Sequence, residues 1–403
     1  MAVNSLNFEQ VATVLTSIVK QATNQAVITP TDTASFTSVA QIALRADRDA
    51  VMNAISNVLA RTIFSIRPYS AKLTGLEIDT FRWGNMMRKL SIVDSDWADD
   101  PAYAWPATYD ATHTGNETGD GQMIDMWTIK KPNVLQTNFY GASVYFDEMT
   151  IFEDQIETAF SGPEQLGSFL SLLMTNLSNR LEMSNEGLRR GLVCNAIGAL
   201  KAENNSERNI HLLTEYNTLT GNTYTVADIY TPAVFDAFCK WLYARVAEIS
   251  DLFSANSTMF QTVITNKPIL RHTPAEMQRV YMYSPFLRQM DARVLADTFH
   301  DTFIRFADVE ALPYWQSIKT RDQVKVTPVY TGTDGTVTTG SATTVSNVIG
   351  LIFDRDAMGM TVLDRRVLST PVNTKGLYRN LHVHCKQRVV WDSTEKACLL
   401  TLD

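Results

Sequence analysis

SGPEQLGSFLSLLMTNLSNRLEMSNEGLRRGLVCNAIGALK, residues 161–201, carries the clearest local signal in this chain. Ser161 can cap a helix, Pro163 suits a first helical turn, and Glu164 places negative charge where the helix dipole favours it. Apolar residues then recur at spacings of three, four and seven, at Leu166, Phe169, Leu170, Leu173, Leu177, Leu181, Leu188 and Leu192. With its rise per residue, such a helix would be roughly 60 Å long. The stretch therefore predicts one nearly continuous helix that is longer than a small domain is wide.

A coiled coil is the alternative interpretation of this stretch. Ser184 interrupts the apolar stripe, and Gly187 and Gly191 weaken the C-terminal half of the helix. We therefore favour a single helix that packs within its own fold.

The composition describes a globular chain with an unusually uncharged surface. Of 403 residues, 45% are hydrophobic and only 19% are charged, and the net charge is −8. Globular proteins usually have a larger charged fraction. The low fraction in this chain is explained if neighbouring molecules cover much of its surface. Since the chain has no basic run, it is not expected to hold nucleic acid tightly.

The cysteines and the apolar stretches indicate in which cellular compartment the protein is expected. The chain has four cysteines, Cys194, Cys239, Cys385 and Cys398, and none forms a C-x-x-C pair. This favours reduced thiols in a cytoplasmic protein. Residues 1–11 have no basic residue and no long apolar run, so they do not resemble a secretory signal. Apolar stretches such as 169–174 are too short to span a bilayer.

The N-terminal region predicts an arm. Residues 7–20 form an amphipathic pattern with Asn7 as a plausible cap, residues 21–36 read as a linker, and a second helix is expected over 38–59. The apolar face of the first helix comprises Phe8, Val11, Leu15 and Ile18. A short helix of this kind has little to bury against in its own domain. We therefore expect it to pack on another subunit and to contribute little to the folding of its own.

Two alternating segments, 62–94 and 123–146, predict strands on either side of an acidic stretch. Residues 95–122 contain six carboxylates and no Lys or Arg, and they include the aromatic residues Trp97, Tyr103, Trp105 and Tyr109. A structureless loop of this length is uncommon inside a compact domain. A two-stranded arm whose tip meets a partner surface explains the stretch better than a mobile surface loop, which is the alternative.

The remainder predicts mixed α and β structure. Helices are expected over 232–249, 274–282 and 285–291, and strands over 261–264, 324–330 and 345–353. The last expected elements are strands over 381–391 and 397–402, joined as a β-hairpin by a turn at 392–396. The chain is therefore expected to belong to the α+β class.

Motifs for catalysis or cofactor binding are absent from the sequence. It contains no phosphate-binding G-x-x-x-x-G-K-[ST], no G-x-G-x-x-G and no G-x-S-x-G. His382 and His384 would share one strand face and could form a metal site with His300 or Cys398, but an ordinary half-exposed strand face is favoured. Asp354, Asp356 and Asp364 have no cation-loop spacing. We expect no catalytic residue, no cofactor and no metal ion; an unrecognised α+β enzyme is the alternative.

The order of these elements resembles the major capsid proteins of tailed bacteriophages, which have the HK-ninety-seven-type fold. Three strings carry the resemblance: TIFSIRPYSAKL at Thr62–Leu73, NVIGLIFDRDAMGMTVLDRR at Asn347–Arg366 and LYRNLHVHCKQRVVWDSTEKACLLTL at Leu377–Leu402. The resemblance covers nearly the whole chain, and it rests on the order and lengths of the elements.

The resemblance implies a division of the chain into named parts. These are an N-terminal arm at 1–36, a P-domain entry at 37–75, an E-loop at 76–135, a P-domain with the spine helix at 136–224, an A-domain at 225–372 and a P-domain return with the closing hairpin at 373–403. It also implies a shell of hexamers and pentamers of this chain around double-stranded DNA, assembled in the cytoplasm of a host bacterium. An encapsulin-like cargo compartment is the alternative within this fold.

Contacts between subunits follow from the resemblance and from the charge pattern. E-loops and N-terminal arms would lie across neighbours, and the acidic stretch would dock on a basic patch, although a cation site is the alternative. The candidates for the basic patch are Arg379, Lys386 and Arg388, or the pair Arg189 and Arg190. A portal and a separate scaffolding protein are the other expected partners, with weak contact to packaged DNA and no membrane.

Overall fold

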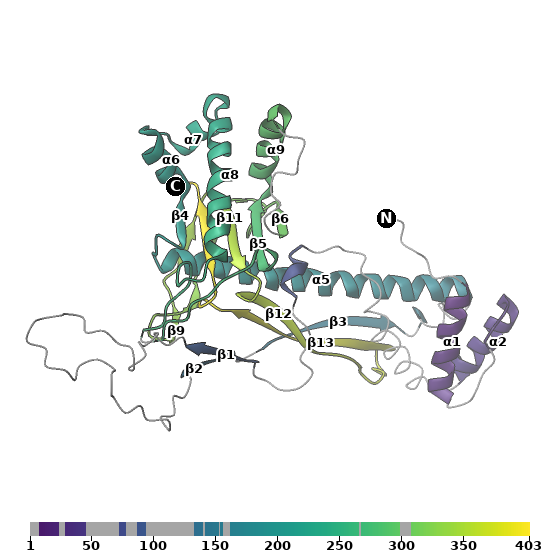
Figure 1. Ribbon diagram of the computed structural model, residues 1–403. Coiled ribbons are helices and arrows are strands. Elements are labelled where there is room, and N and C mark those ends of the chain that lie inside the picture. The colour runs from purple at the N-terminus through teal and green to yellow at the C-terminus, as the bar shows by residue number, and fades with distance from the viewer. Residues whose placement is uncertain are drawn as a thin grey trace, which may run out of the picture.

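A computed structural model describes residues 8–23, 29–45, 72–77, 87–93, 133–139, 142–152, 154–155, 162–265, 267–298 and 308–403. A long helix, α5, runs across the molecule, with a body of helices and strands at its C-terminal end and two short helices at its N-terminal end (Figure 1). A three-stranded sheet lies along the helix, and a two-stranded ribbon lies below the body.

Helix α5 spans Pro163–Ala202 without interruption, which confirms the predicted helix. Leu177 and Leu181 pack on the three-stranded sheet, and the C-terminal part of the helix enters the core of the body. A side chain at Gly198 would collide with Val326, so glycine is required where a strand crosses the helix closely. The apolar stripe is thus used within the fold and not in a coiled coil.

The three-stranded sheet is antiparallel and has the order β12-β13-β3. Its strands are β3 (Ser143–Phe152), β12 (Met358–Ser369) and β13 (Tyr378–Trp391). Leu381, Val383 and Cys385 of β13 are buried towards α5, and the residues between them are only half-buried. The alternation follows from the two-residue period of a strand, since α5 covers one face of the sheet alone.

The body contains a five-stranded sheet of order β4-β14-β11-β5-β6. The strands are β4 (Asn209–His211), β5 (Gln278–Tyr283), β6 (Asp308–Leu312), β11 (Val348–Asp354) and β14 (Ala397–Thr401). The helices are α6 (Leu212–Thr220), α7 (Val226–Ile229), α8 (Pro232–Ser254) and α9 (Ser284–Thr298). Val280, Ile352 and Leu400 pack among these helices, while Tyr281, Leu351 and Leu399 face the core beneath α5. Both faces of this sheet are therefore covered.

Three local predictions for the body are wrong. Residues 274–282 form a short 3-10 turn, Ala275–Met277, followed by β5. Residues 261–264 form no regular strand, because their polar groups bond elsewhere: the Thr262 amide donates to the Ser393 carbonyl at 2.9 Å. The strand expected over 324–330 is divided into β7 (Val324–Val326) and β8 (Val329–Thr331), which pair with β10 (Thr343–Val345) and β9 (Val337–Thr339).

The closing strands exist, but the predicted hairpin is wrong. Strand β13 pairs with β12 and β3, whereas β14 pairs with β11 and β4 in the other sheet. The turn between them is held by Lys396, which is fully buried and donates to the carbonyls of Phe253 at 3.0 Å and Ala255 at 2.7 Å. Because the C-terminal end of α8 accepts this ammonium group, the chain crosses from one sheet to the other.

The N-terminal helices pack on their own chain, contrary to prediction. They are α1 (Phe8–Thr23) and α2 (Thr33–Arg45), and the part of the second predicted helix beyond Arg45 lies outside the described residues. Val11, Leu15 and Ile18 are buried between α2 and the N-terminal part of α5, and Phe8 is half-buried. The expectation that this face waits for another subunit fails because α5 is long enough to supply the missing surface.

The ribbon consists of β1 (Met87–Val93) paired antiparallel with β2 (Asn133–Phe139). These strands fall within the two predicted alternating segments. Residues 95–122 between them, with Trp97, Tyr103, Trp105 and Tyr109, lie outside the described residues. Among the helices that the structure describes, none has the length and hydropathy needed to cross a membrane.

Candidate assembly surfaces

The face of the three-stranded sheet that points away from α5 carries exposed apolar side chains among charged and polar ones. We call it the outer sheet face and define it by Val144, Phe146, Glu148, Thr150, Phe152, Asp364, Arg366, Leu368, Asn380, His382, His384 and Lys386. Val144 is 63% exposed, Phe146 56% and Leu368 53%. In an antiparallel sheet with one face in water, the residues on that face are usually polar. Exposed apolar side chains that gather on one sheet face mark a site for another protein.

Two histidines flank the central aromatic residue of this face. The ring of Phe146 lies 5.8 Å from that of His382 and 5.7 Å from that of His384, and its plane is nearly parallel to the second imidazole. The expected ordinary strand face is what the structure shows, since both histidines are half-buried. Cys398 lies in the other sheet and is fully buried, and His300 is outside the described residues. The histidines thus contact Phe146 and do not meet Cys398.

Of the predicted basic patch on β13, only one residue reaches the outer sheet face. Lys386 is half-buried and stands opposite Asp364 of β12 in the register. Arg379 and Arg388 are buried, each only 3% exposed, so the prediction that they form an exposed patch is wrong. Arg366 adds a second cation on this face and pairs with Asp364 at 2.7 Å. The outer sheet face therefore carries two cations beside two carboxylates, Asp364 and Glu148, and is not a basic patch.

The other predicted basic pair lies inside the molecule. Arg189 is fully buried and pairs with Glu77 in the segment before the ribbon and with Glu182 at 3.6 Å. Arg190 pairs with Glu186 at 2.7 Å, and its guanidinium group lies 3.8 Å above the ring of Tyr314. The proposed docking role for this pair is wrong, because both cations hold neighbouring segments of the chain onto α5.

The ribbon presents a second exposed apolar strip. Leu90 and Ile92 of β1 and Val134 of β2 are all more exposed than buried, and Ile92 stands directly opposite Val134. The other side of the ribbon faces the base of the body, through Lys89, Ser91 and Leu135. The ribbon therefore has the same one-sided burial as the three-stranded sheet.

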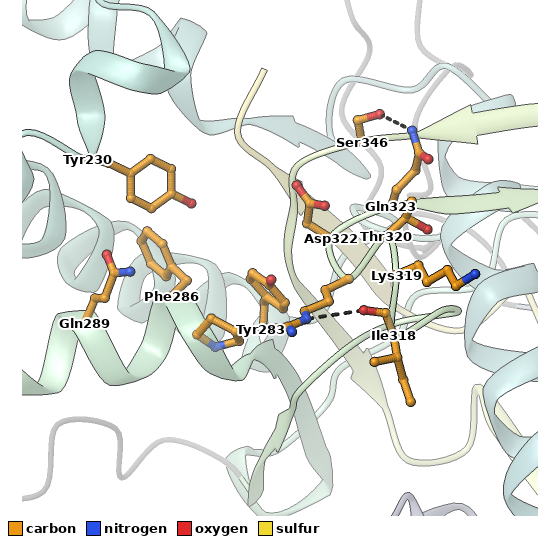
Figure 2. A pocket seen from close by; sticks show the side chains of 12 residues that line it. Tyr230, Tyr283, Phe286, Gln289, Ile318, Lys319, Thr320, Asp322, Gln323 and Ser346 are labelled. Carbon is orange, nitrogen blue, oxygen red and sulfur yellow. Dashed lines mark hydrogen bonds between the residues drawn. The ribbon is translucent and has the colours of Figure 1, made fainter.

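A cavity of about 910 Å³ opens in the body between α9 and residues 318–323 (Figure 2). Tyr230, Tyr283 and Phe286 line one side, and Asp322 lies across from them. Burial, with the nearby Tyr283 and Asp322, raises the pKa of Tyr230 to about 12. Burial and Asp322 also raise the pKa of Tyr283. Both hydroxyl groups therefore stay protonated at neutral pH and can donate hydrogen bonds but cannot act as bases.

The four cysteines are buried and unbonded to one another. Burial raises the pKa of the Cys194 thiol to about 11 and that of Cys398 to about 12. A thiol that stays protonated is a poor nucleophile, so these residues serve as small apolar side chains.

Comparison with known protein families gives the class of protein to which this fold belongs. The chain matches the Phi29-like phage major capsid protein family over residues 15–401, and it belongs to this family. It is therefore a major capsid protein, a structural component of the phage virion that assembles into the icosahedral head shell and not an enzyme.

Solved structures of phage heads share the fold. A chain from the capsid of Staphylococcus phage Andhra is 12% identical, with a TM-score of 0.51, and the match covers 85% of this chain and 86% of that one. A chain from the structure of the head fiber and inner core protein of native bacteriophage P68 is 11% identical, with a TM-score of 0.52, over 83% and 85% of the two chains. No protein with a curated description matches the chain. The fold is the HK-ninety-seven type, α+β, as predicted.

The sequence predictions missed the features that dominate these surfaces. Phe146 was placed in a strand, and His382 and His384 were assigned to one face, but nothing local indicated that the three rings lie together. The signal that was available is the outward apolar alternation of β3, which carries Val144, Phe146 and Phe152 on the face away from α5. It did not show which of the two faces of the strand a helix would cover, because Tyr145, Met149 and Ile151 make the other face apolar as well.

Proposed function

We propose that this capsid protein forms hexamers and pentamers around the double-stranded DNA of a tailed phage, and that copies meet through the outer sheet face. The observation that carries the proposal is the exposure of Phe146 between two histidines on a sheet whose other face is already covered by α5. Burial of one such aromatic ring stabilises a contact by about 2 kcal/mol. Repeated over many copies, contacts of this size give a durable shell.

The partner that fits this face is the acidic segment 95–122 of another copy. This segment offers carboxylates and the aromatic residues Trp97, Tyr103, Trp105 and Tyr109. The outer sheet face offers apolar side chains together with Lys386, Arg366 and two imidazoles. Apolar and aromatic contact would supply the main attraction, because Asp364 and Glu148 balance the two cations of the face. Of the basic residues predicted from the sequence, this proposal keeps Lys386. It replaces the four buried arginines, Arg189, Arg190, Arg379 and Arg388, with Arg366 and the two histidines.

The other partners follow from the family and the composition. A portal and a separate scaffolding protein would complete the head, and assembly would take place in the cytoplasm of the host bacterium. Contact with packaged DNA would be weak, because the chain has a net charge of −8 and no basic run. We retain the six-part division of the chain, from the arm at 1–36 to the return at 373–403, as part of this proposal.

Native mass and one substitution test the proposal. Phe146→Asp should prevent the formation of megadalton particles, because a buried unpaired carboxylate is costly at a contact. Val337→Asp is the matched control, since Val337 is also highly exposed but lies on β9, away from the outer sheet face. Native mass spectrometry of both variants gives the answer. If Phe146→Asp assembled into normal particles, the outer sheet face would not be a contact between copies.

A further inference from the structure

The turn between β13 and β14 consists of five polar residues, all of them buried. We call residues 392–396, with the sequence DSTEK, the polar turn; none of its residues is more than 6% exposed. Polar side chains are costly to bury without a partner, so a run of this kind is stable when its members are bonded. The bonds that these side chains make therefore show which segments the polar turn joins.

Three side chains of the polar turn bind the body. Ser393 donates to the carbonyl of Thr331 on β8 at 3.2 Å. Lys396 donates to the carbonyls at the end of α8. Glu395 pairs with Arg271 at 2.6 Å. The polar turn is therefore fixed to the body through three separate segments.

The ribbon is bonded to the same turn. Lys89, on the inward side of β1, places its Nζ 2.5 Å from Oδ2 of Asp392 and in contact with Oε1 of Glu395. Arg271 adds a second link, because its Nη2 donates to Oγ of Ser91 on β1 at 3.2 Å while its Nη1 pairs with Glu395. Charged groups thus join the ribbon to a turn that the body already holds.

The ribbon needs such a link to keep its direction. It is a separate two-stranded sheet, since β1 and β2 pair only with each other among the described strands, and such a ribbon is marginal in water by itself. Its connection to the three-stranded sheet is at one end, because β2 ends at Phe139 and β3 begins at Ser143. The bonds to the body lie farther along, where Ser91 stands opposite Leu135. Two points of attachment fix a direction that one end alone would not.

We propose that Lys89 is a positioning residue, which acts through the polar turn to hold the ribbon in one direction relative to the body. For assembly this inference rests on the proposed function: the ribbon then presents its apolar strip and the segment 95–122 to a neighbouring copy at a fixed angle. A ribbon that is already ordered loses less conformational entropy when a contact forms, so association is favoured.

The charges around the polar turn explain why Lys89 matters more than the apolar contact beside it. Without Lys89, Asp392 would keep the amide and hydroxyl of Thr394, at 3.0 Å and 2.7 Å, and Glu395 would keep Arg271. Two buried carboxylates would then share one cation, which is unfavourable as long as the ribbon covers them. Leu135 of β2 lines a small crevice with Thr394 but is only half-buried, so its contribution is expected to be smaller.

Distances between spin labels on the full-length, unassembled subunit test this role. One label at Ile92→Cys follows the ribbon and one at Leu219→Cys on α6 follows the body, since these side chains are 65% and 67% exposed. The four native cysteines are buried and should not react with the label. Pulsed electron–electron double resonance should give one narrow distance distribution. Labels at Met183→Cys on α5 and Leu219→Cys form the reference pair and should also give a narrow one.

Three variants sharpen the test. Lys89→Met should broaden the distribution for the ribbon pair and leave the reference pair narrow. It should also lower the protection of residues 87–93 from hydrogen exchange at least about tenfold, because two bonds to charged groups are lost. Lys89→Arg keeps the charge and should recover most of both properties. Asp147→Asn on β3 is the matched control: it removes an ion pair with Arg180 at 2.8 Å and should behave as wild type.

Three results would overturn the positioning role. The first is a Lys89→Met variant with an unchanged distribution for the ribbon pair. The second is a Leu135→Ala variant that broadens this distribution more than Lys89→Met does, since the apolar contact would then hold the ribbon. The third is broadening of both label pairs by Lys89→Met, which would mean that Lys89 supports the whole subunit.

Native mass spectrometry tests the consequence for assembly separately. Lys89→Met should form fewer megadalton particles than Lys89→Arg, and equal yields would contradict the link between ribbon direction and assembly. The label distances concern a single subunit. If Phe146→Asp assembled normally while Lys89→Met broadened the ribbon distribution, the contact through the outer sheet face would fail and the positioning role would stand.

Discussion

The five-stranded sheet is covered on both faces, whereas the three-stranded sheet is covered on one. In the first, all residues of β11 and β14 are buried. In the second, β3 alternates between residues that face α5 and residues such as Phe146 that face outwards. The same chain therefore builds one sheet that stabilises the subunit and one that remains available for contact. If the proposed function is right, stability and assembly rest on different sheets, and substitutions can separate them.

The largest expected effect comes from the closed sheet. Leu351 lies on β11 and is fully buried in the core beneath α5. Leu351→Ala should lower the free energy of unfolding by about 3 kcal/mol, through lost burial and the cavity left behind. Leu368→Ala on the outer sheet face is the matched control and should change it by less than about 0.5 kcal/mol. Chemical denaturation of both variants measures the difference; equal losses would contradict the division between the sheets.

A slightly smaller effect is expected where α1 meets α5. Leu15 is fully buried, so α1 is expected to contribute to the stability of the subunit, as the five-stranded sheet does. Leu15→Ala should cost about 2 kcal/mol if α1 packs on its own chain. The measurement is the thermal midpoint of the unassembled subunit. A midpoint unchanged from wild type would restore the original prediction that this helix contributes to assembly alone.

The last pair of effects, which includes the smallest one, compares two glycines on α5. A Cβ at Gly198, inside the body, would meet Val326 and Pro328, so Gly198→Ala should destabilise by about 1–3 kcal/mol. A Cβ at Gly187, outside the body, would meet nothing within 4 Å. Gly187→Ala should therefore stabilise by roughly 0.5–1 kcal/mol through helix propensity alone. If both variants shifted the denaturation midpoint in the same direction, the two glycines would not lie in different environments along α5.

Local patterns predicted the elements better than the contacts between them. The helix at Pro163–Ala202 was predictable because its apolar spacing and its N-terminal residues agree. The hairpin at the end of the chain was mispredicted, because the groups that separate its strands, Lys396 and the last carbonyls of α8, are distant in sequence. Strand β5 was read as helical because Pro274 and a short apolar run do not reveal that β11 and β6 flank them.

The candidate contact residues were harder to predict than the fold. From the sequence, Arg189 and Arg190 are expected to be exposed, because arginine side chains usually are. They are buried because other segments cover them: Arg189 pairs with Glu77, and Arg190 donates to the carbonyl of Tyr314. Glu182 and Glu186, their other partners, lie on α5 itself. The exposed state of Phe146 was equally hidden, because an alternating strand does not show which of its two faces a helix will cover.

The central place of β14 has a consequence for synthesis. Strand β4 has β14 as its one neighbour in the five-stranded sheet, and β14 is made long after β4 has left the ribosome. Until residues 397–401 emerge, β4 has no strand to pair with and one edge of β11 stays open. Contacts between such distant segments form slowly. Growing chains therefore lack a finished body, which delays the point at which neighbouring chains on one messenger can begin to associate.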